Sequence, residues 1–166
     1  MRKIVIGIMG PGAGATETNL QNAHQLGELI AQQNWVLLTG GRNSGVMEAA
    51  SQGAKKANGF VIGILPTTDP NSVSPAVDIA IFTDMGNARN NINILSSDVV
   101  VACGMGAGTA SEVGLALKAN KNVILLNTGE ESKLFFQSLS KDYVFLANSP
   151  QDVIHLIHKI ITNESF

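Results

Sequence analysis

The sequence predicts an α/β protein with a Rossmann-like, doubly wound and mainly parallel sheet of six or seven strands, with helices on both faces. Short β-branched segments alternate with longer segments of helical periodicity along the whole chain. The short segments are continuously apolar, which is typical of strands that are covered on both faces. Regular strand–helix alternation implies right-handed crossovers, and these connect parallel strands.

The expected strands are apolar runs at 3–9, 35–39, 60–65, 78–82, 98–103, 122–126 and 143–146. The expected helices lie between them, at 18–33, 45–57, 87–97, 109–120, 132–140 and 150–162. Segment 66–77 contains three prolines and is either a surface connection or a lid over a site. Because no linker or repeat divides the sequence, we expect residues 1–166 to form a single Rossmann-like ligand-binding domain.

Composition and charge exclude several classes of protein. Hydrophobic residues make up 45% of the chain and charged residues 14%, as in a compact globular protein. A net charge of −2 gives no general attraction to nucleic acid or to acidic membranes, and no apolar run approaches the roughly 20 residues that span a bilayer. The basic and apolar start of the chain leads into a glycine-rich turn, so we interpret it as a strand rather than a signal peptide. Cys103 is the single cysteine, which is expected of a protein from a reducing cytoplasm.

Three glycine-rich segments follow predicted strands. In a parallel sheet of this class, ligands bind at the carboxyl ends of the strands. Glycine lets a ligand approach the main chain closely, and the start of the following helix attracts anions. The binding residues expected from these loops are Gly10, Gly12, Ala13 and Gly14, then Gly40, Gly41, Arg42, Ser44 and Gly45, and finally Gly104, Met105, Gly106, Ala107, Gly108 and Thr109.

Common nucleotide motifs do not fit these loops. The first loop follows a strand like a dinucleotide fingerprint, but the second predicted strand ends at Thr39 without the acidic residue that would hold a ribose. No loop carries the Lys-Ser or Lys-Thr pair of a Walker sequence. The loops therefore point to an anion without specifying a nucleotide.

Metal and nucleophile signals are weak. His155 and His158 are three residues apart, but without a third ligand nearby they are more simply residues of a helix surface. Cys103 ends an apolar strand and is either a buried thiol or a sulfur that faces a ligand. We predict no metal ligands and no catalytic residues.

Two ionisable residues invite opposite interpretations. Arg89 is the one lysine or arginine between Lys56 and Lys118, and it is either a phosphate clamp at a strand's carboxyl end or a residue of the helix surface. Glu112 stands three residues after Thr109, so the pair is either a helix capping box or a threonine beside an acid that faces the site. Asn87 and Asn90 flank the arginine and supply neutral hydrogen bonds.

Three motifs, taken in order, resemble the superfamily historically called lysine-decarboxylase-like, which contains the Lonely-Guy phosphoribohydrolases. They are Gly40-Gly41-x-x-x-Gly45-Val46-Met47, Met85-Gly86-Asn87-Ala88-Arg89-Asn90 and Gly106-x-Gly108-Thr109-x-x-Glu112. Over nearly its whole length, the chain is most similar to the molybdenum cofactor carrier proteins of algae and cyanobacteria within this superfamily.

The chain departs from the hydrolase motifs of this superfamily. The hydrolases carry Pro-Gly-Gly-x-Gly-Thr-x-x-Glu, whereas this sequence reads GMGAGTASE from Gly104 to Glu112. Their Met-His-x-Arg-Lys motif lacks its histidine and lysine here. By resemblance, Arg89 and Glu112 correspond to the catalytic arginine and glutamate. The changed surroundings favour binding of phosphate without cleavage of a glycosidic bond.

The resemblance implies a protein that binds molybdenum cofactor (molybdopterin) for storage, protection and transfer, without turnover. The alternatives are a phosphoribohydrolase acting on nucleoside 5′-monophosphates and a nucleotide-sensing module on the same scaffold. The implied partners are a small pterin/phosphate ligand, with molybdoenzymes or cofactor-synthesis proteins as donors and acceptors. Apolar helical positions, for example Val113, Leu115, Ala116 and Leu117, together with the resemblance, predict a homodimer or homotetramer.

Overall fold

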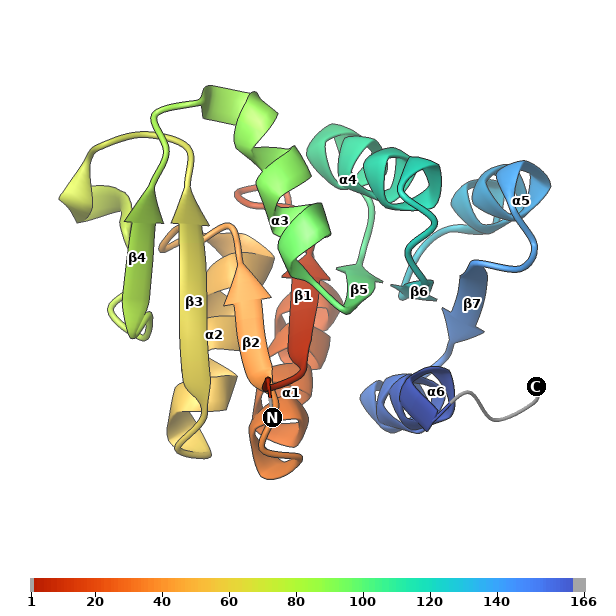
Figure 1. Ribbon diagram of the computed structural model, residues 1–166, viewed down its shortest axis with the longest axis horizontal. Coiled ribbons are helices and arrows are strands. Elements are labelled where there is room, and N and C mark those ends of the chain that lie inside the picture. The colour runs from red at the N-terminus through yellow and green to blue at the C-terminus, as the bar shows by residue number, and fades with distance from the viewer. Residues whose placement is uncertain (1, 163–166) are drawn as a thin grey trace.

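The computed structural model describes residues 2–162 and contains an open seven-stranded sheet with helices on both faces (Figure 1). All neighbouring strands are parallel, in the order β4-β3-β2-β1-β5-β6-β7. The strands are β1 (Val5–Met9), β2 (Val36–Thr39), β3 (Phe60–Leu65), β4 (Ile79–Phe82), β5 (Val99–Cys103), β6 (Val123–Leu126) and β7 (Val144–Ala147). The α-helices are α1 (Glu17–Gln32), α2 (Gly45–Lys56), α3 (Asn90–Ser96), α4 (Ala107–Lys118), α5 (Glu130–Leu139) and α6 (Pro150–Thr162). The predicted fold class is confirmed.

Two apolar layers cover the sheet, because the central strands are hydrophobic on both faces. Every residue of β5 and β6 is buried. Side chains such as Ile8 and Val101 pack beneath α1, α2 and α6, whereas Met9 and Val100 pack beneath α3 and α4 (Figure 1). The apolar N-terminal run forms β1, paired with β2 and β5 at the centre of the sheet, as the sequence predicts.

One corner of the sheet is not covered by any helix of residues 2–162. The connection from β3 to β4 contains only the short 3₁₀ helix η1 (Pro70–Ser72), and it packs on the α2 side, where the Ser74 amide donates to the Gly41 carbonyl at 2.9 Å. On the opposite side, Phe60, Ile79 and Ile81 keep over 40% of their surface exposed. We call these three residues the open face.

Three predicted helices begin two or more residues from the expected position, including the helix expected at 132–140, which begins at Glu130. The helix expected at 87–97 is divided into the 3₁₀ helix η2 (Gly86–Arg89) and α3. The helix expected at 109–120 begins at Ala107, with Gly106 as its N-cap. The capping-box interpretation of Thr109 and Glu112 is therefore wrong, because Thr109 lies inside the first turn rather than at the cap. Both side chains are instead buried beside the carboxyl ends of the strands.

Among the described helices, none combines the length and the apolar character that a bilayer span requires.

Candidate functional site

A pocket of about 300 Å³ lies at the carboxyl ends of the strands, where the chain reverses its winding direction. The chain leaves β1 through α1 toward β2 on one side, while β5 lies on the other. The loop after β1 and the loop after β5 therefore lead away from each other and leave a crevice between them. The pocket is lined by Ile8, Met9, Gly10, Pro11, Gly12, Gly40, Met47, Asn87, Arg89, Asn90, Gly106, Ala107, Gly108, Thr109 and Glu112.

The pocket brings together most of the residues expected from the sequence. Its lining includes Gly10, Gly12, Gly40, Asn87, Arg89, Asn90, Gly106, Ala107, Gly108, Thr109 and Glu112. Gly104 and Met105 lie instead in a second, polar hollow with Thr16, Thr18, Asn19, Asn127 and Gly129. Ala13, Gly14, Gly41, Arg42, Ser44 and Gly45 line neither hollow, and neither does the segment 66–77.

Gly45 shapes the pocket without lining it. It has a φ of +57°, and a Cβ there would lie 2.2 Å from the Gly12 carbonyl oxygen. The start of α2 can therefore approach the loop after β1, where the Val46 amide donates to the Pro11 carbonyl at 3.0 Å. Arg42, in the same loop, is exposed, and its backbone forms an isolated antiparallel β-bridge with Val73.

The start of α4 gives the pocket a set of main-chain donors. The amides of the first turn have no partner within the helix, and Gly106 provides no side chain to cap them. A Cβ on Gly108 would meet no atom within 4 Å, so the approach to these amides is open. Thr109 adds a buried hydroxyl that has no hydrogen-bond partner among residues 2–162. This combination of amides, helix dipole and unpaired hydroxyl suits an oxyanion.

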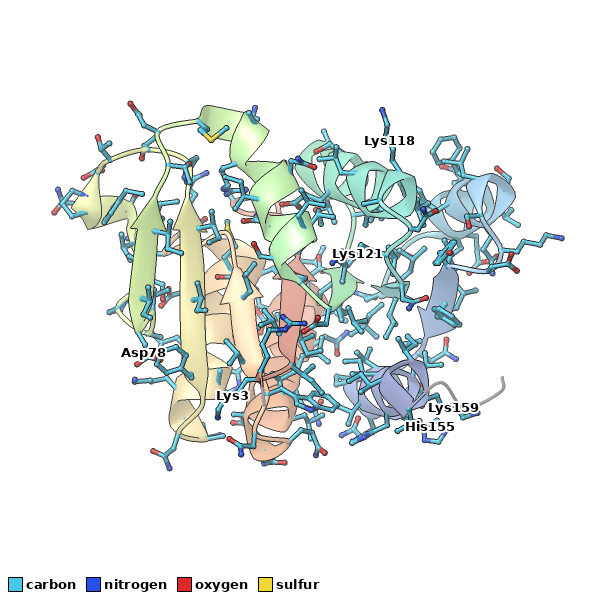
Figure 2. All side chains as sticks on the ribbon, viewed as in Figure 1. Lys3, Asp78, Lys118, Lys121, His155 and Lys159 are labelled. Carbon is cyan, nitrogen blue, oxygen red and sulfur yellow. The ribbon has the colours of Figure 1, made fainter. Side chains whose placement is uncertain are left out.

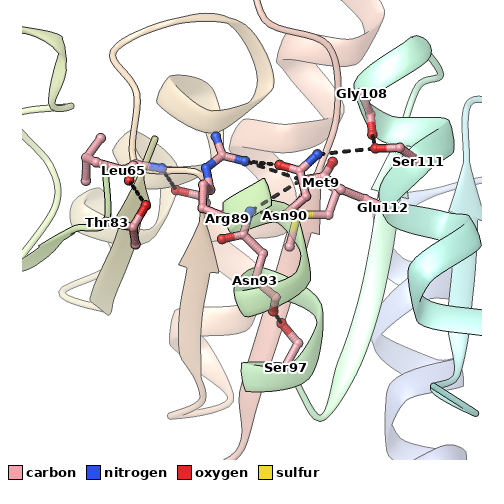
Figure 3. A network of polar contacts seen from close by, with 12 residues as sticks. Met9, Leu65, Thr83, Arg89, Asn90, Asn93, Ser97, Gly108, Ser111 and Glu112 are labelled. Atoms are coloured by element: carbon pink, nitrogen blue, oxygen red, sulfur yellow. Dashed lines mark hydrogen bonds and ion pairs between the residues drawn. The ribbon is translucent and has the colours of Figure 1, made fainter. Parts of the chain in front are cut away.

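Arg89 is the one cationic side chain in the described lining of the pocket. Its guanidinium lies against Gly40, where a Cβ would come within 2.6 Å of Nη2. Nη1 donates to the Asn90 side-chain oxygen and lies 3.7 Å from Glu112 Oε1 (Figure 3). Nε is buried and has no hydrogen-bond partner in the part of the chain that the structure describes. Burial lowers the pKa of Arg89 from its usual value, while Glu112 opposes that change; a guanidinium remains charged in proteins.

Glu112 is buried on α4 and faces Arg89 across the pocket (Figure 3). Burial raises its pKa to about 7, although Arg89 and a hydrogen bond from Asn93 both act to lower it. The Asn93 amide nitrogen lies 3.3 Å from Glu112 Oε1. The carboxyl group therefore changes its charge near neutral pH.

Sequence reasoning missed the apolar lining and Asn93. Met9 and Met47 belong to elements whose apolar residues predict core, so nothing in the sequence separates them from the interior. Asn93 is fully buried and follows Arg89 by four positions, which places both on one side of a helical segment. That spacing within a predicted helix is the signal that could have identified it.

The residues considered for metal binding lie away from the pocket. His155 is exposed on α6 and points away from the sheet (Figure 2), and His158 hydrogen-bonds Gln33 at 2.8 Å. Cys103 is fully buried, its pKa is raised to about 12 by burial, and its thiol contacts the Asn19 carbonyl. Residues 2–162 contain no cluster of three or more histidine, cysteine, aspartate or glutamate side chains that could hold a metal ion.

An open parallel sheet with a crevice at its reversal point, lined by glycine-rich loops and one buried guanidinium, defines the Rossmann-like class of folds, which bind ligands at this place. The chain belongs to the SLOG cluster4 family, whose model matches residues 3–154.

Two solved structures are similar to this chain over almost its whole length. The molybdenum cofactor binding protein from the phototrophic bacterium Rippkaea orientalis is 64% identical, with a TM-score of 0.95 over 97% of this chain and 99% of that one. The molybdenum cofactor carrier protein from Chlamydomonas reinhardtii is 50% identical, with a TM-score of 0.93 over the same shares. An uncharacterized protein of Archaeoglobus fulgidus is 44% identical over 126 residues, which are 76% of this chain and 82% of that protein. The family expected from the three sequence motifs is confirmed.

Proposed function

We propose that this protein binds molybdenum cofactor as cargo and holds it for storage, protection and transfer, without chemical turnover. The observation that carries the proposal is the pocket itself, in which unpaired donors surround one buried guanidinium. The names of the two similar solved proteins support the same ligand.

The chemistry of the pocket suits the parts of this cargo. The α4 amides, Thr109 and Arg89 offer donors to a phosphate or oxo group. Asn87 and Asn90 offer amide groups to a polar pterin ring. Met47 adds a polarizable apolar contact, and thioethers pack favourably against aromatic rings. A site that relies mostly on neutral donors can release its ligand to a partner, as a carrier must.

One observation favours the alternative, a phosphoribohydrolase. Arg89 and Glu112 correspond to the catalytic pair of that family, and they lie together in the pocket at 3.7 Å. A buried carboxyl group that titrates near neutral pH is also a reasonable general acid. The loop GMGAGT departs from the hydrolase motif at its start, and for this reason we place the carrier first.

The partners and compartment belong to the same proposal. Molybdoenzymes or cofactor-synthesis proteins would donate and accept the cargo, in the cytoplasm. The protein would act as a homodimer or homotetramer. The apolar open face of the sheet supports self-association, since contiguous exposed apolar surface commonly marks an interface. Of the apolar helical positions expected to favour pairing, Val113 and Ala116 are buried within the subunit, whereas Leu115 and Leu117 are half-buried.

The proposal is tested by native mass spectrometry under anaerobic conditions, with molybdenum cofactor in one sample and AMP in another. We expect a stoichiometric cofactor adduct and unchanged AMP. The opposite result, no cofactor adduct with conversion of AMP to adenine and ribose phosphate, would make the protein a hydrolase with Arg89 and Glu112 as its catalytic residues.

A further inference from the structure

The guanidinium of Arg89 pairs with one carboxylate and still has a free donor. Its Nη1 lies 3.7 Å from Glu112 Oε1, while its Nε is buried and has no hydrogen-bond partner among the described residues. Both residues line the pocket. An anionic ligand that seats against Arg89 therefore places a second negative charge close to the buried carboxylate.

The surroundings of Glu112 provide no other charge to offset that approach. The described elements α3, β1 and β6 contain no titratable side chain, and Cys103 of β5 is neutral and packs in the opposite apolar layer. On α5, Glu130 and Glu131 are exposed and Lys133 pairs with Glu130. Lys118, at the far end of α4, is exposed. The exposed Arg42 is positively charged, and its charge acts to lower the pKa of Arg89.

We propose that Glu112 takes up one proton when the anionic end of the cargo binds against Arg89, so that binding neutralises the carboxylate instead of leaving two negative charges side by side. This inference rests on the proposed function. It adds a determinant of affinity that the carrier role does not require. In this arrangement Asn93 donates to the carboxyl oxygen of Glu112 in either protonation state.

The affinity for the anionic ligand changes with pH in a direction that is set by the pKa of Glu112 in the empty pocket and in the occupied pocket. In the empty pocket the pKa of Glu112 is about 7, and a bound anion raises the pKa further because it adds negative charge and shares Arg89. Below pH 7 the carboxyl group is already neutral, so the affinity is constant. Above pH 7 a proton must be taken from solution, and the affinity falls by at most about tenfold per pH unit, as one-proton linkage requires.

The test compares the parent protein with Glu112→Gln, a neutral side chain of the same shape. Dissociation constants for molybdenum cofactor are measured anaerobically at pH 6 and 8.5, and proton uptake is measured by calorimetry in two buffers of different ionisation enthalpy. Relative to Glu112→Gln, we expect the parent affinity to fall up to about 30-fold over this range, with close to one more proton taken up by the parent at high pH. At pH 6, where the carboxyl group of the parent is already neutral, the two proteins should bind with similar affinity.

The cargo phosphate also titrates in this range, but it does so equally with both proteins, and the difference between them isolates Glu112. Glu48→Gln is a matched control, because it removes a carboxylate from α2 outside the pocket lining, and it should keep the parent pH dependence. Tight binding with the same pH dependence in Glu112→Gln and the parent would overturn the inference while the carrier function stands. If the parent failed to bind cofactor at any pH, both proposals would fall.

Discussion

Glu112 is a carboxyl group that is held away from water beside a single guanidinium. Its pKa is about 7 in the folded protein, well above the 4.5 of an unperturbed glutamate. The native state therefore keeps a proton that the unfolded chain has already lost at intermediate pH. By linkage, the contribution of this group to stability is complete below pH 4.5, falls as pH rises, and is lost above about pH 7.

We predict that the free energy of unfolding falls more steeply with pH in the parent protein than in Glu112→Gln. Between pH 4.5 and 8 the parent should lose about 3 kcal/mol more than the variant, because the pKa of Glu112 is about 7 in the folded protein and 4.5 in an unperturbed glutamate. Urea unfolding at the two pH values measures this difference, and all other titrating groups are common to both proteins. Parallel pH profiles would mean that Glu112 ionises in the folded state at its ordinary pKa.

At the scale of single elements, the start of α4 determines the floor of the pocket. Gly106 has a φ of −152°, an extended conformation open to any residue, and Gly108 has free space around its missing Cβ. The fold therefore does not require a glycine at either position. Both glycines line the pocket, and their lack of a side chain keeps free space above the amide groups at the start of α4.

We predict that Gly108→Val folds normally and loses cofactor binding by more than tenfold, because the new methyl groups would occupy the pocket. Valine has a higher helix propensity than glycine, so the thermal midpoint should be no lower than that of the parent. Gly114→Val is the control: it lies on the same helix, also has no neighbour within 4 Å of its Cβ, and lies outside the pocket lining. Equal affinity in Gly108→Val and the parent would remove the α4 turn from the binding site.

The beginning of α4 also shows where sequence reasoning stops. The periodicity of apolar residues placed this helix correctly, but its first residue depends on which neighbour caps it. Thr109 has the side chain of a good N-cap, whereas the actual N-cap, Gly106, gives no such signal. Likewise, the three glycine-rich loops could be located from the strands that precede them. Backbone angles, such as the positive φ of Gly41 and Gly45, determine which residues of a loop face the crevice. The order of residue types along the sequence does not reveal these angles.

At the scale of the whole molecule, the order of the strands explains both the pocket and the open face. The pocket follows from the reversal of winding beside β1. The open face is exposed because the β3–β4 connection contains only a three-residue 3₁₀ helix, which is too short to cover the sheet. The sequence shows the irregular segment 66–77 but not the side of the sheet on which it packs, because that choice depends on contacts with Gly41 and Arg42 that are distant in sequence.

We predict that the open face mediates self-association. Replacing Ile79 and Ile81 by lysine should convert the assembly to monomers at micromolar concentration, because four charges would then be buried at a two-fold interface. Light scattering after size-exclusion chromatography measures the mass. Leu134→Lys places a charge on another exposed apolar residue, 67% accessible on α5, and should leave the assembly intact. A parent protein that is already monomeric would contradict the prediction.

The donors at the start of α4 have a consequence for how this site can be mapped. Peptide N–H groups are present whatever side chain a residue carries, and Ala107 and Gly108 have almost no side chain to truncate. An alanine scan of the pocket would therefore register Arg89, Thr109 and the asparagines but would pass over the amides without effect. Replacing the Ala107–Gly108 or Gly108–Thr109 peptide bond by an ester deletes a single N–H and leaves the side chains in place. Backbone chemistry of that kind, rather than conventional mutagenesis, is the direct way to weigh the contribution of this turn.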